Sequence, residues 1–391
     1  MEIVCPPLTA ATEKLHLGNL YTWMLIDTYK KAGQLRGVDI VARESWNCYS
    51  QKLEEKVKLE NPRFDRERII EECYGEVEKN ISSAHAIFRR YHINFDKPII
   101  KDDSNEFLRF INEEISRKEM LKRINNGRLE LPPKKKVLEH ARAIHWTPAD
   151  IWKRYYGLST LERVEEIPVF REGSYGIPFD GKVLGQRFVQ SMLPEFYSFL
   201  GIPTINLVIC GNDILTKWIY FMIANSEFTP FDRVGLSGLV LGKNKRKLSK
   251  YDSQINTIAE IKDHPDNVRL GLLRQSFGKD FVHPDFSQEE KLRTKALNCL
   301  AFFKGYTSQN EEHKFDVGSI KRASLEIAQD IRNLDFQKAY LNFRKFVYDT
   351  ISKGVIPRIR LNGIDRDSFK EVTSDFKRVA NIFIPTTINK E

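Results

Sequence analysis

The sequence has 391 residues, of which 41% are hydrophobic and 29% charged, a balance that argues against global disorder. Its length allows two or three domains, each with its own core. The formal net charge of +9 favours a polyanionic partner, because clustered Lys and Arg release counterions from phosphates, although a basic enzyme without such a partner fits equally well.

The five cysteines are scattered along the chain and form no C-x-x-C pair. This spacing argues against a zinc module and against a secreted disulfide framework. No stretch approaches the roughly 20 apolar residues that a membrane-spanning helix needs. The first residues also lack the pattern of a signal peptide. We therefore expect a cytoplasmic protein with reduced thiols, no membrane partner and no metal-binding site.

The first sixty residues have the pattern of a βαβ unit. Residues 3–5 predict a short apolar strand that Pro6 and Pro7 stop. An apolar helical pattern begins at His16 and ends near residues 33–37, and residues 38–42 predict the next strand. Strand, helix and strand in this order indicate a parallel sheet.

Residues 60–165 show a highly charged helical pattern, which predicts an insertion. A strand at 205–210, a helix from Asp213 and a strand-like run at 235–241 restore the α/β pattern. Every periodic segment beyond residue 257 is helical. We therefore predict an α/β fold: a Rossmann-type parallel sheet split by a helical insertion and followed by an all-helical C-terminal domain. The expected parts are 1–59 (first half of the Rossmann catalytic domain), 60–165 (insertion), 166–257 (second half, with a lysine loop) and 258–391 (helical domain).

The segment His16-Leu17-Gly18-Asn19 follows a predicted strand and starts a predicted helix. A helix N-terminus presents free N–H groups and a partial positive charge, which suit phosphate. Gly18 lets a nucleotide lie against the backbone. His16 and Asn19 can donate hydrogen bonds to phosphate oxygens on which charge develops. Taken alone, however, four such residues are more often an ordinary helix start.

A basic loop at 242–250 follows the last predicted strand and contains Lys247-Leu248-Ser249-Lys250. Phosphoryl and adenylyl transfers depend on positioned cations, so a lysine over the phosphates is chemically apt. Taken alone, this loop is better explained as a solvated basic turn.

In this order, the two segments resemble the signature pair of class I aminoacyl-tRNA synthetases. In that family, an H-x-G-H or H-x-G-N motif and a K-M-S-K-S loop flank ATP on one Rossmann fold. Three further blocks resemble the subgroup for isoleucine, valine, leucine and methionine. They are Ser45–Val57 (G-W-D-C-H-G-L-P-I-E-L-K-V), Arg171–Pro178 (R-x-x-Y-W-G-I-P) and Gly211–Ile214 (G-x-D-I).

The resemblance implies a role for individual residues. His16 and Asn19 would hold the ATP phosphates, and Lys250, with Lys247, would stabilise the leaving pyrophosphate. The remaining ATP contacts would come from Gly18, Gly211, Asp213, Gly238 and Val240, with Asp213 on the ribose hydroxyls and Gly238 and Val240 offering backbone to adenine. The amino-acid pocket would be formed by Cys5, Pro6, Asn47 and Trp218. A core tryptophan is nearly as good an explanation of Trp218.

Several positions depart from the family pattern. Glu13 stands where the family usually has glycine, and Asn47 replaces the aspartate that pairs with the substrate ammonium. An amide oxygen still accepts a hydrogen bond but loses the charge assistance that roughly doubles its strength. Tyr49 and Ser50 begin the run that replaces H-G-L-P, and Tyr251 replaces the last serine of the lysine loop. The insertion is too short for an editing domain, which predicts a compact paralogue.

These observations predict an enzyme that activates an amino acid, preferably a compact aliphatic one, with ATP as an aminoacyl adenylate and transfers it to tRNA. Mg²⁺ is implied by ATP and would be bound through the phosphates. A small-molecule amine or a carrier protein as acceptor, and a non-catalytic RNA-binding paralogue, remain alternatives. Acidic residues such as Glu54 and Glu55 are expected on solvated helix faces. The oligomeric state is left open.

Overall fold

The structure is a computed structural model of the chain. It describes residues 1–5, 9–11, 15–42, 44, 46–96, 104–115, 124–149, 166–201, 204–242, 244–246, 257–307 and 315–389. Of the positions singled out above, those outside the described residues are Pro6, Pro7, Glu13, Ser45, Lys247, Leu248, Ser249, Lys250 and Tyr251.

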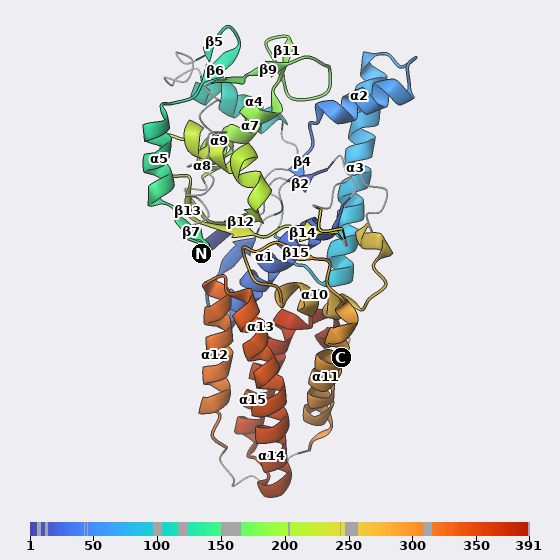
Figure 1. The fold of residues 1–391 in the computed structure, drawn as a ribbon, viewed down its shortest axis with the longest axis vertical. Coiled ribbons are helices and arrows are strands. Elements are labelled where there is room, and N and C mark those ends of the chain that lie inside the picture. The colour runs from blue at the N-terminus through green and yellow to red at the C-terminus, as the bar shows by residue number, and fades with distance from the viewer. Residues whose placement is uncertain are drawn as a thin grey trace.

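A five-stranded, all-parallel sheet lies near mid-height in the molecule, above the helices of the C-terminal bundle (Figure 1). Its strands follow the order β3-β1-β12-β13-β7. Their bounds are β1 (Glu2–Cys5), β3 (Ile40–Ala42), β12 (Ile205–Gly211), β13 (Phe231–Ser237) and β7 (His145–Thr147). Apolar runs such as 205–210 form these strands because both faces of a parallel sheet are covered. The predicted α/β fold is confirmed.

Helix α1 (Leu17–Leu35) connects β1 to β3 and lies between the sheet and the C-terminal helices (Figure 1). It is buried along nearly its whole length, including Leu20, Met24, Leu25 and Ile26 at 0% exposure. A helix that is apolar on most sides belongs in the middle of a core. The N-terminus of α1 is therefore held rigidly at the edge of the sheet.

Residues 51–184 contain more strand than expected. The helices are α2 (Gln51–Glu60), α3 (Arg66–Tyr91), α4 (Ser104–Phe110), a continuing turn (Ile111–Ile115) and α5 (Lys134–Ala143). Two small antiparallel sheets join β5 (Ile124–Asn125), β6 (Arg128–Glu130) and β8 (Glu166–Pro168), and β9 (Phe170–Arg171), β10 (Pro178–Phe179) and β11 (Lys182–Leu184).

The expectation of a wholly helical insertion at 60–165 is therefore wrong in part. It contains β5 and β6, and it also contains β7, which is an edge strand of the central sheet. A three-residue strand is too short to show an alternating pattern. The strand is anchored by Trp146, which is 4% exposed and donates from Nε1 to the Ala141 carbonyl at 2.7 Å.

The second half of the chain returns to the sheet and then forms a helical bundle. Its helices are α7 (Gln186–Ser191), α8 (Leu193–Phe199), a short helical stretch (Asn212–Ile219), α9 (Tyr220–Asn225), α10 (Pro265–Leu273), α11 (Glu290–Gly305), α12 (Gly318–Arg332), α13 (Phe336–Lys345), its continuation (Phe346–Val355), α14 (Ile356–Asn362), α15 (Arg366–Phe383) and α16 (Pro385–Ile388). The all-helical expectation for 258–391 needs one correction, because β15 (Phe281–Val282) pairs with β14 (Val240–Leu241).

A buried ion cluster joins α1 to the C-terminal bundle. The Asp27 carboxylate, 0% exposed, lies 2.5 Å from Lys31 Nζ and 2.7 Å from Arg269 Nη1 of α10. Burial alone would raise the pKa of Asp27, but the charges of Lys31 and Arg269 outweigh it and hold the pKa below its usual value. Burial lowers the pKa of Lys31 to about 8 in spite of Asp27.

The other groups in the cluster are hydrogen-bonded to backbone. Lys31 Nζ donates to the His92 carbonyl at 2.7 Å, and Arg269 Nη2 donates to the Tyr91 carbonyl at 3.0 Å. The Asn94 amide donates to Asp27 Oδ1 at 2.9 Å. The cluster therefore holds α1, the end of α3 and α10 in one arrangement.

Two expectations about compartment can be compared with the structure. All five cysteines are buried and free of disulfides. Among the described residues, none of the helices combines the length and the apolar character required to span a bilayer.

Candidate adenylation site

His16 caps the N-terminus of α1. Its Nδ1 accepts a hydrogen bond from the Gly18 amide at 3.1 Å, and Asn19 Oδ1 accepts one from the His16 amide at 3.1 Å. A neutral imidazole that accepts at Nδ1 carries its proton at Nε2. Asn19, whose oxygen is engaged, has its Nδ2 hydrogens as donors. Both side chains can therefore donate hydrogen bonds at a helix N-terminus, which suits phosphate oxygens.

Gly18 fits this cap for a steric reason. A Cβ at Gly18 would lie 2.9 Å from His16 Cε1, closer than real contacts allow. A side chain here would push the imidazole out of its capping position, so the glycine keeps His16 in place.

A segment that follows the basic loop in the chain, beginning at Thr257, lies beside this cap. Thr257, the first described residue after the lysine segment, forms an antiparallel bridge with His16. The Ile258 amide donates to the Leu15 carbonyl at 3.4 Å. The chain that leaves the loop is therefore paired with the residues that begin α1, although Lys247 and Lys250 themselves are outside the described residues.

The order of the strands reverses at the same edge of the sheet. From β1 the chain moves to β3 on one side, and later to β12 on the other. In open α/β sheets, ligands bind outside the carboxyl ends of strands at such a reversal. Cys5 ends β1 and Gly211 ends β12 there. Asp213 lies two positions after Gly211, and a Cβ on Gly211 would lie 2.8 Å from Asp213 Oδ1.

Asp280 is a site residue that sequence reasoning missed. Its Oδ1 accepts from the Leu239 amide at 2.7 Å and from Asn212 Nδ2 at 3.3 Å. It therefore links the turn after β12 to the turn after β13. An aspartate in a loop gives no local signal for such a role.

The structure gives Gly238 and Val240 different roles. A Cβ on Gly238 would lie 1.8 Å from the Lys279 carbonyl oxygen, so the glycine is required by close packing of two backbones. Val240 lies opposite Phe281 in a parallel pair, in which the Leu239 carbonyl accepts from the Phe281 amide and the Leu241 carbonyl from the amide of His283, directly after β15. Successive residues alternate in direction, so the N–H and C=O of Val240 face away from β15. Backbone groups that face away from β15 in this way suit the edge of adenine.

Replacing Gly238 with Ala is expected to destabilise the fold by about 1–3 kcal/mol, because backbone must move to admit the methyl group. The matched control is Gly75→Ala in α3, where nothing lies within 4 Å of the added Cβ. It should raise stability by about 0.5–1 kcal/mol, the usual gain of Ala over Gly in a helix. Denaturant unfolding measures both. A Gly238→Ala variant as stable as the unchanged chain would contradict the packing.

The residues expected around the acid lie on separate elements. Cys5 and Trp218 are 1% and 5% exposed and belong to the same apolar cluster. Trp218 Nε1 is buried and has no hydrogen-bond partner among the residues that the structure describes. Asn47 lies in β4 (Trp46–Asn47), which pairs with β2 (Thr9–Ala10), and its carbonyl accepts from the Ala11 amide at 3.1 Å.

The expectation that Glu54 is solvated is wrong. Its side chain is 2% exposed and accepts from Arg171 Nη1 at 3.0 Å, from the Ser174 amide at 2.6 Å and from Lys58 Nζ at 2.8 Å. Burial alone would raise the pKa of Glu54, but the bonds from Lys58, Ser174 and Arg171 outweigh it and lower the pKa. Glu55, one position on, is exposed as expected.

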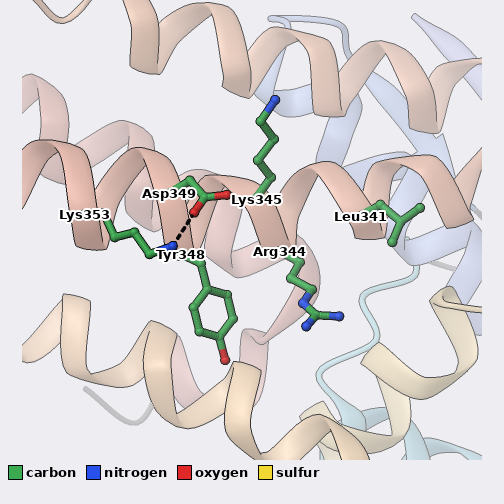
Figure 2. Close-up of a pocket in the computed structure, with 6 residues that line it drawn as sticks. All are labelled: Leu341, Arg344, Lys345, Tyr348, Asp349 and Lys353. Atoms are coloured by element: carbon green, nitrogen blue, oxygen red, sulfur yellow. Dashed lines mark hydrogen bonds and ion pairs between the residues drawn. The ribbon is translucent and has the colours of Figure 1, made fainter.

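A basic cavity lies on the C-terminal bundle, away from the sheet edge. It has a volume of about 490 Å³ and is lined by Leu341, Arg344, Lys345, Tyr348, Asp349 and Lys353. Figure 2 shows Arg344 and Tyr348 pointing to the same side of their helix, and the guanidinium lies 6.0 Å from the ring centroid. Asp349 pairs with Lys353 at 2.9 Å. Cations beside an aromatic ring suit a phosphate with a stacked base.

No protein-family model and no curated protein matches the sequence. Solved structures do match. Mycobacterium tuberculosis methionyl-tRNA synthetase in complex with methionyl-adenylate is similar with a TM-score of 0.70 at 14% identity, covering 100% of this chain and 92% of the other. A second structure of the M. tuberculosis enzyme bound by methionyl-adenylate gives 0.67 at 14% identity, covering 100% and 93%. Over its whole length, this chain has the fold of the class I aminoacyl-tRNA synthetases.

Proposed function

We propose that this protein activates an amino acid with ATP to form an aminoacyl adenylate, and then transfers the aminoacyl group to tRNA. The observation that carries the proposal is the pairing of His16 with Thr257 at the carboxyl edge of the sheet. It pairs the helix cap that suits phosphate with a residue seven positions beyond Lys250 in the chain. The similar mycobacterial structures, which hold methionyl-adenylate, support the same chemistry.

In the proposed reaction, a carboxylate oxygen of the amino acid attacks the α-phosphorus of ATP. The bond from that phosphorus to the bridging oxygen breaks, and pyrophosphate leaves. Nε2–H of His16 and Nδ2–H of Asn19 would donate to phosphate oxygens as charge moves onto them. Lys247 and Lys250 would neutralise the leaving group, as the family resemblance implies. Mg²⁺ would enter with ATP on its phosphates.

The remaining ATP contacts follow from the same geometry. Asp213, directly after β12, would accept hydrogen bonds from the ribose hydroxyls. The N–H and C=O of Val240 would bind the adenine edge, with Gly238 beside them. Each of these contacts positions ATP for in-line attack, and the reaction then needs no general base.

The acid is proposed to be compact and aliphatic. The buried indole of Trp218 supports a small apolar side chain, since a larger one would have to displace core packing. Asn47 would accept one hydrogen bond from the substrate ammonium through its side-chain oxygen. We propose that the protein works in the cytoplasm, where its free thiols would stay reduced.

Pyrophosphate exchange into ATP tests the proposal when it is measured with a panel of amino acids. We expect exchange with at least one compact aliphatic acid, and its loss in Lys250→Ala. No exchange with any acid, together with unchanged behaviour of Lys250→Ala, would leave a non-catalytic RNA-binding protein as the better explanation.

The acceptor is the less constrained half of the proposal. The basic cavity supports tRNA, because Arg344, Lys345 and Lys353 line it and the Arg344 guanidinium lies beside the Tyr348 ring. A small-molecule amine or a carrier protein is the second candidate. It is favoured by the short insertion, which is too small for an editing domain. A salt series with bulk tRNA distinguishes the two.

If tRNA is the acceptor, its affinity should fall steeply with salt, and the double variant Arg344→Gln/Lys345→Gln should flatten the logarithmic slope by roughly 2, about 0.9 for each lost phosphate contact. The control is Lys377→Gln/Arg378→Gln, an exposed adjacent pair on α15. It removes the same charge outside the cavity and should leave the slope unchanged. Weak binding with a flat salt dependence would favour the small-molecule or carrier acceptor.

A further inference from the structure

A buried network joins two segments that are far apart in the chain, the start of α2 and the turn between β9 and β10. At its centre is Glu54, whose two carboxylate oxygens are both engaged. Oε2 accepts from Arg171 Nη1 at 3.0 Å, and Oε1 accepts from the Ser174 amide at 2.6 Å. Arg171 also donates to the carbonyls of Glu172, at 2.8 Å, and of Tyr175. The carboxylate and the guanidinium together therefore fold the turn 172–176.

The backbone of this turn is shaped around Glu54. Gly173 has φ of +122°, and a Cβ there would lie 2.4 Å from Glu54 Oε2 and 2.6 Å from Arg171 Nη1. A residue with a side chain is therefore excluded both by its backbone angle and by the carboxylate. The turn is built against Glu54 and does not merely lie near it.

Tyr175, in the same turn, contacts the segment that contains Asn47. Tyr175 is 0% exposed, and its hydroxyl donates to the Cys48 carbonyl at 3.0 Å. The ring of Tyr49 packs on Tyr175 with centroids 5.5 Å apart. Cys48 directly follows Asn47, the last residue of β4. The Asn47 carbonyl accepts a hydrogen bond from the Ala11 amide. A continuous path of contacts thus runs from Glu54 through Tyr175 to the residue proposed to meet the substrate ammonium.

We propose that Glu54 is a positioning residue for amino-acid binding: with Arg171 it fixes Tyr175, and Tyr175 fixes the Asn47–Tyr49 segment at the acid-binding side of the site. The proposal rests on the proposed function, because it assigns the acid to that side. It predicts an effect on the acid and not on ATP, since the path of hydrogen bonds from Glu54 ends at Cys48, directly after β4, and none of its bonds among the described residues ends on α1 or β14.

The test compares Glu54→Gln with Glu55→Gln. Glu55 is the next residue on α2, is exposed, and accepts from Gln51. For Glu54→Gln, we expect the KM of the acid in pyrophosphate exchange to rise at least tenfold, while the KM of ATP stays within twofold. Glu55→Gln should change neither constant. An equal rise in both constants, or no change in either, would overturn the positioning role.

Tyr175→Phe is a second variant that leaves the Glu54–Arg171 pair intact and removes only the bond to Cys48. It should raise the KM of the acid in the same direction. Combined with Glu54→Gln, its effect should be less than the product of the two single effects, because both act along one path. If the two effects on the KM of the acid multiply in the double variant, the two residues act independently and the path from Glu54 through Tyr175 is contradicted.

Hydrogen exchange gives a measure that does not depend on activity. In Glu54→Gln, the amides of residues 46–49 and of Ala11 should exchange at least tenfold faster, while those of α1 stay unchanged. If amide exchange is faster in Glu54→Gln but the unchanged protein activates no amino acid, the proposed function is refuted and the structural role of the network stands. Unchanged amide exchange in a chain that does activate an acid would overturn the positioning role alone.

Discussion

Replacing Asp27 with Asn is expected to lower the free energy of unfolding by about 3–5 kcal/mol, the usual cost of removing one partner from a buried ion pair. The change leaves two cations, Lys31 and Arg269, facing each other without their shared carboxylate. Because these groups join α1 to α10, unfolding of the bundle and of the sheet domain should both shift. Denaturant unfolding, followed by circular dichroism, measures the loss.

A matched control exists in the same chain. Asp349 and Lys353 form a second pair four residues apart on a helix, at 2.9 Å, but their side chains are 53% and 75% exposed. Asp349→Asn should cost no more than about 0.5 kcal/mol, because water screens the pair and competes for it. Similar losses in the two variants would show that burial does not determine the strength of the Asp27 cluster.

The pH dependence gives a second check on Asp27→Asn. Burial lowers the pKa of Lys31 to about 8 in the folded chain, against about 10.4 unfolded, so the unfolded state binds more protons in between and stability rises with pH. Without Asp27, the pKa of Lys31 in the folded chain falls further, so the rise in stability begins at a lower pH. The deficit of the variant should therefore be larger at pH 6 than at pH 9. A deficit that grows over that range would contradict this account.

The parts of the fold that the sequence predicted are long or strongly apolar. Helix α1 and strand β12 bury most of their residues, so their patterns are clear. Strands β7 and β15 have only three and two residues, and no period can be recognised at that length. Tertiary pairing alone makes them strands, which is why 60–165 and 258–391 were expected to be more helical than they are.

The candidate site shows the same contrast between residues that a local pattern locates and residues that only tertiary contacts place. The proposed ATP-binding half depends on residues at the ends of elements, such as His16 and Asp213, which a motif with the right order can locate. The segment proposed to bind the amino acid is positioned by contacts between residues that are far apart in the sequence. Glu54 looks like any charged residue on an amphipathic helix, and only the fold shows that Arg171 and Ser174 cover it. Local patterns do not encode which charged residue is covered.

Replacing His16 with Ala is expected to reduce the rate of pyrophosphate exchange by about 10²–10³-fold, the usual effect of removing one donor that meets developing charge. The same change removes the acceptor of the Gly18 amide and should cost about 0.5–2 kcal/mol of stability as a lost helix cap. The rate and the stability must therefore be separated, because an unfolded cap alone would also lower activity.

His16→Asn separates them. Asparagine is among the best N-cap residues, so its oxygen should replace Nδ1 as the acceptor of the Gly18 amide and return most of the lost stability. Its amide is too short to place a donor where Nε2–H lies, so the exchange rate should stay low. Full recovery of the rate in His16→Asn would show that His16 acts by capping α1, and the phosphate contact would then belong to the helix N-terminus and Asn19. A stable but slow variant would establish that the imidazole itself takes part in adenylation.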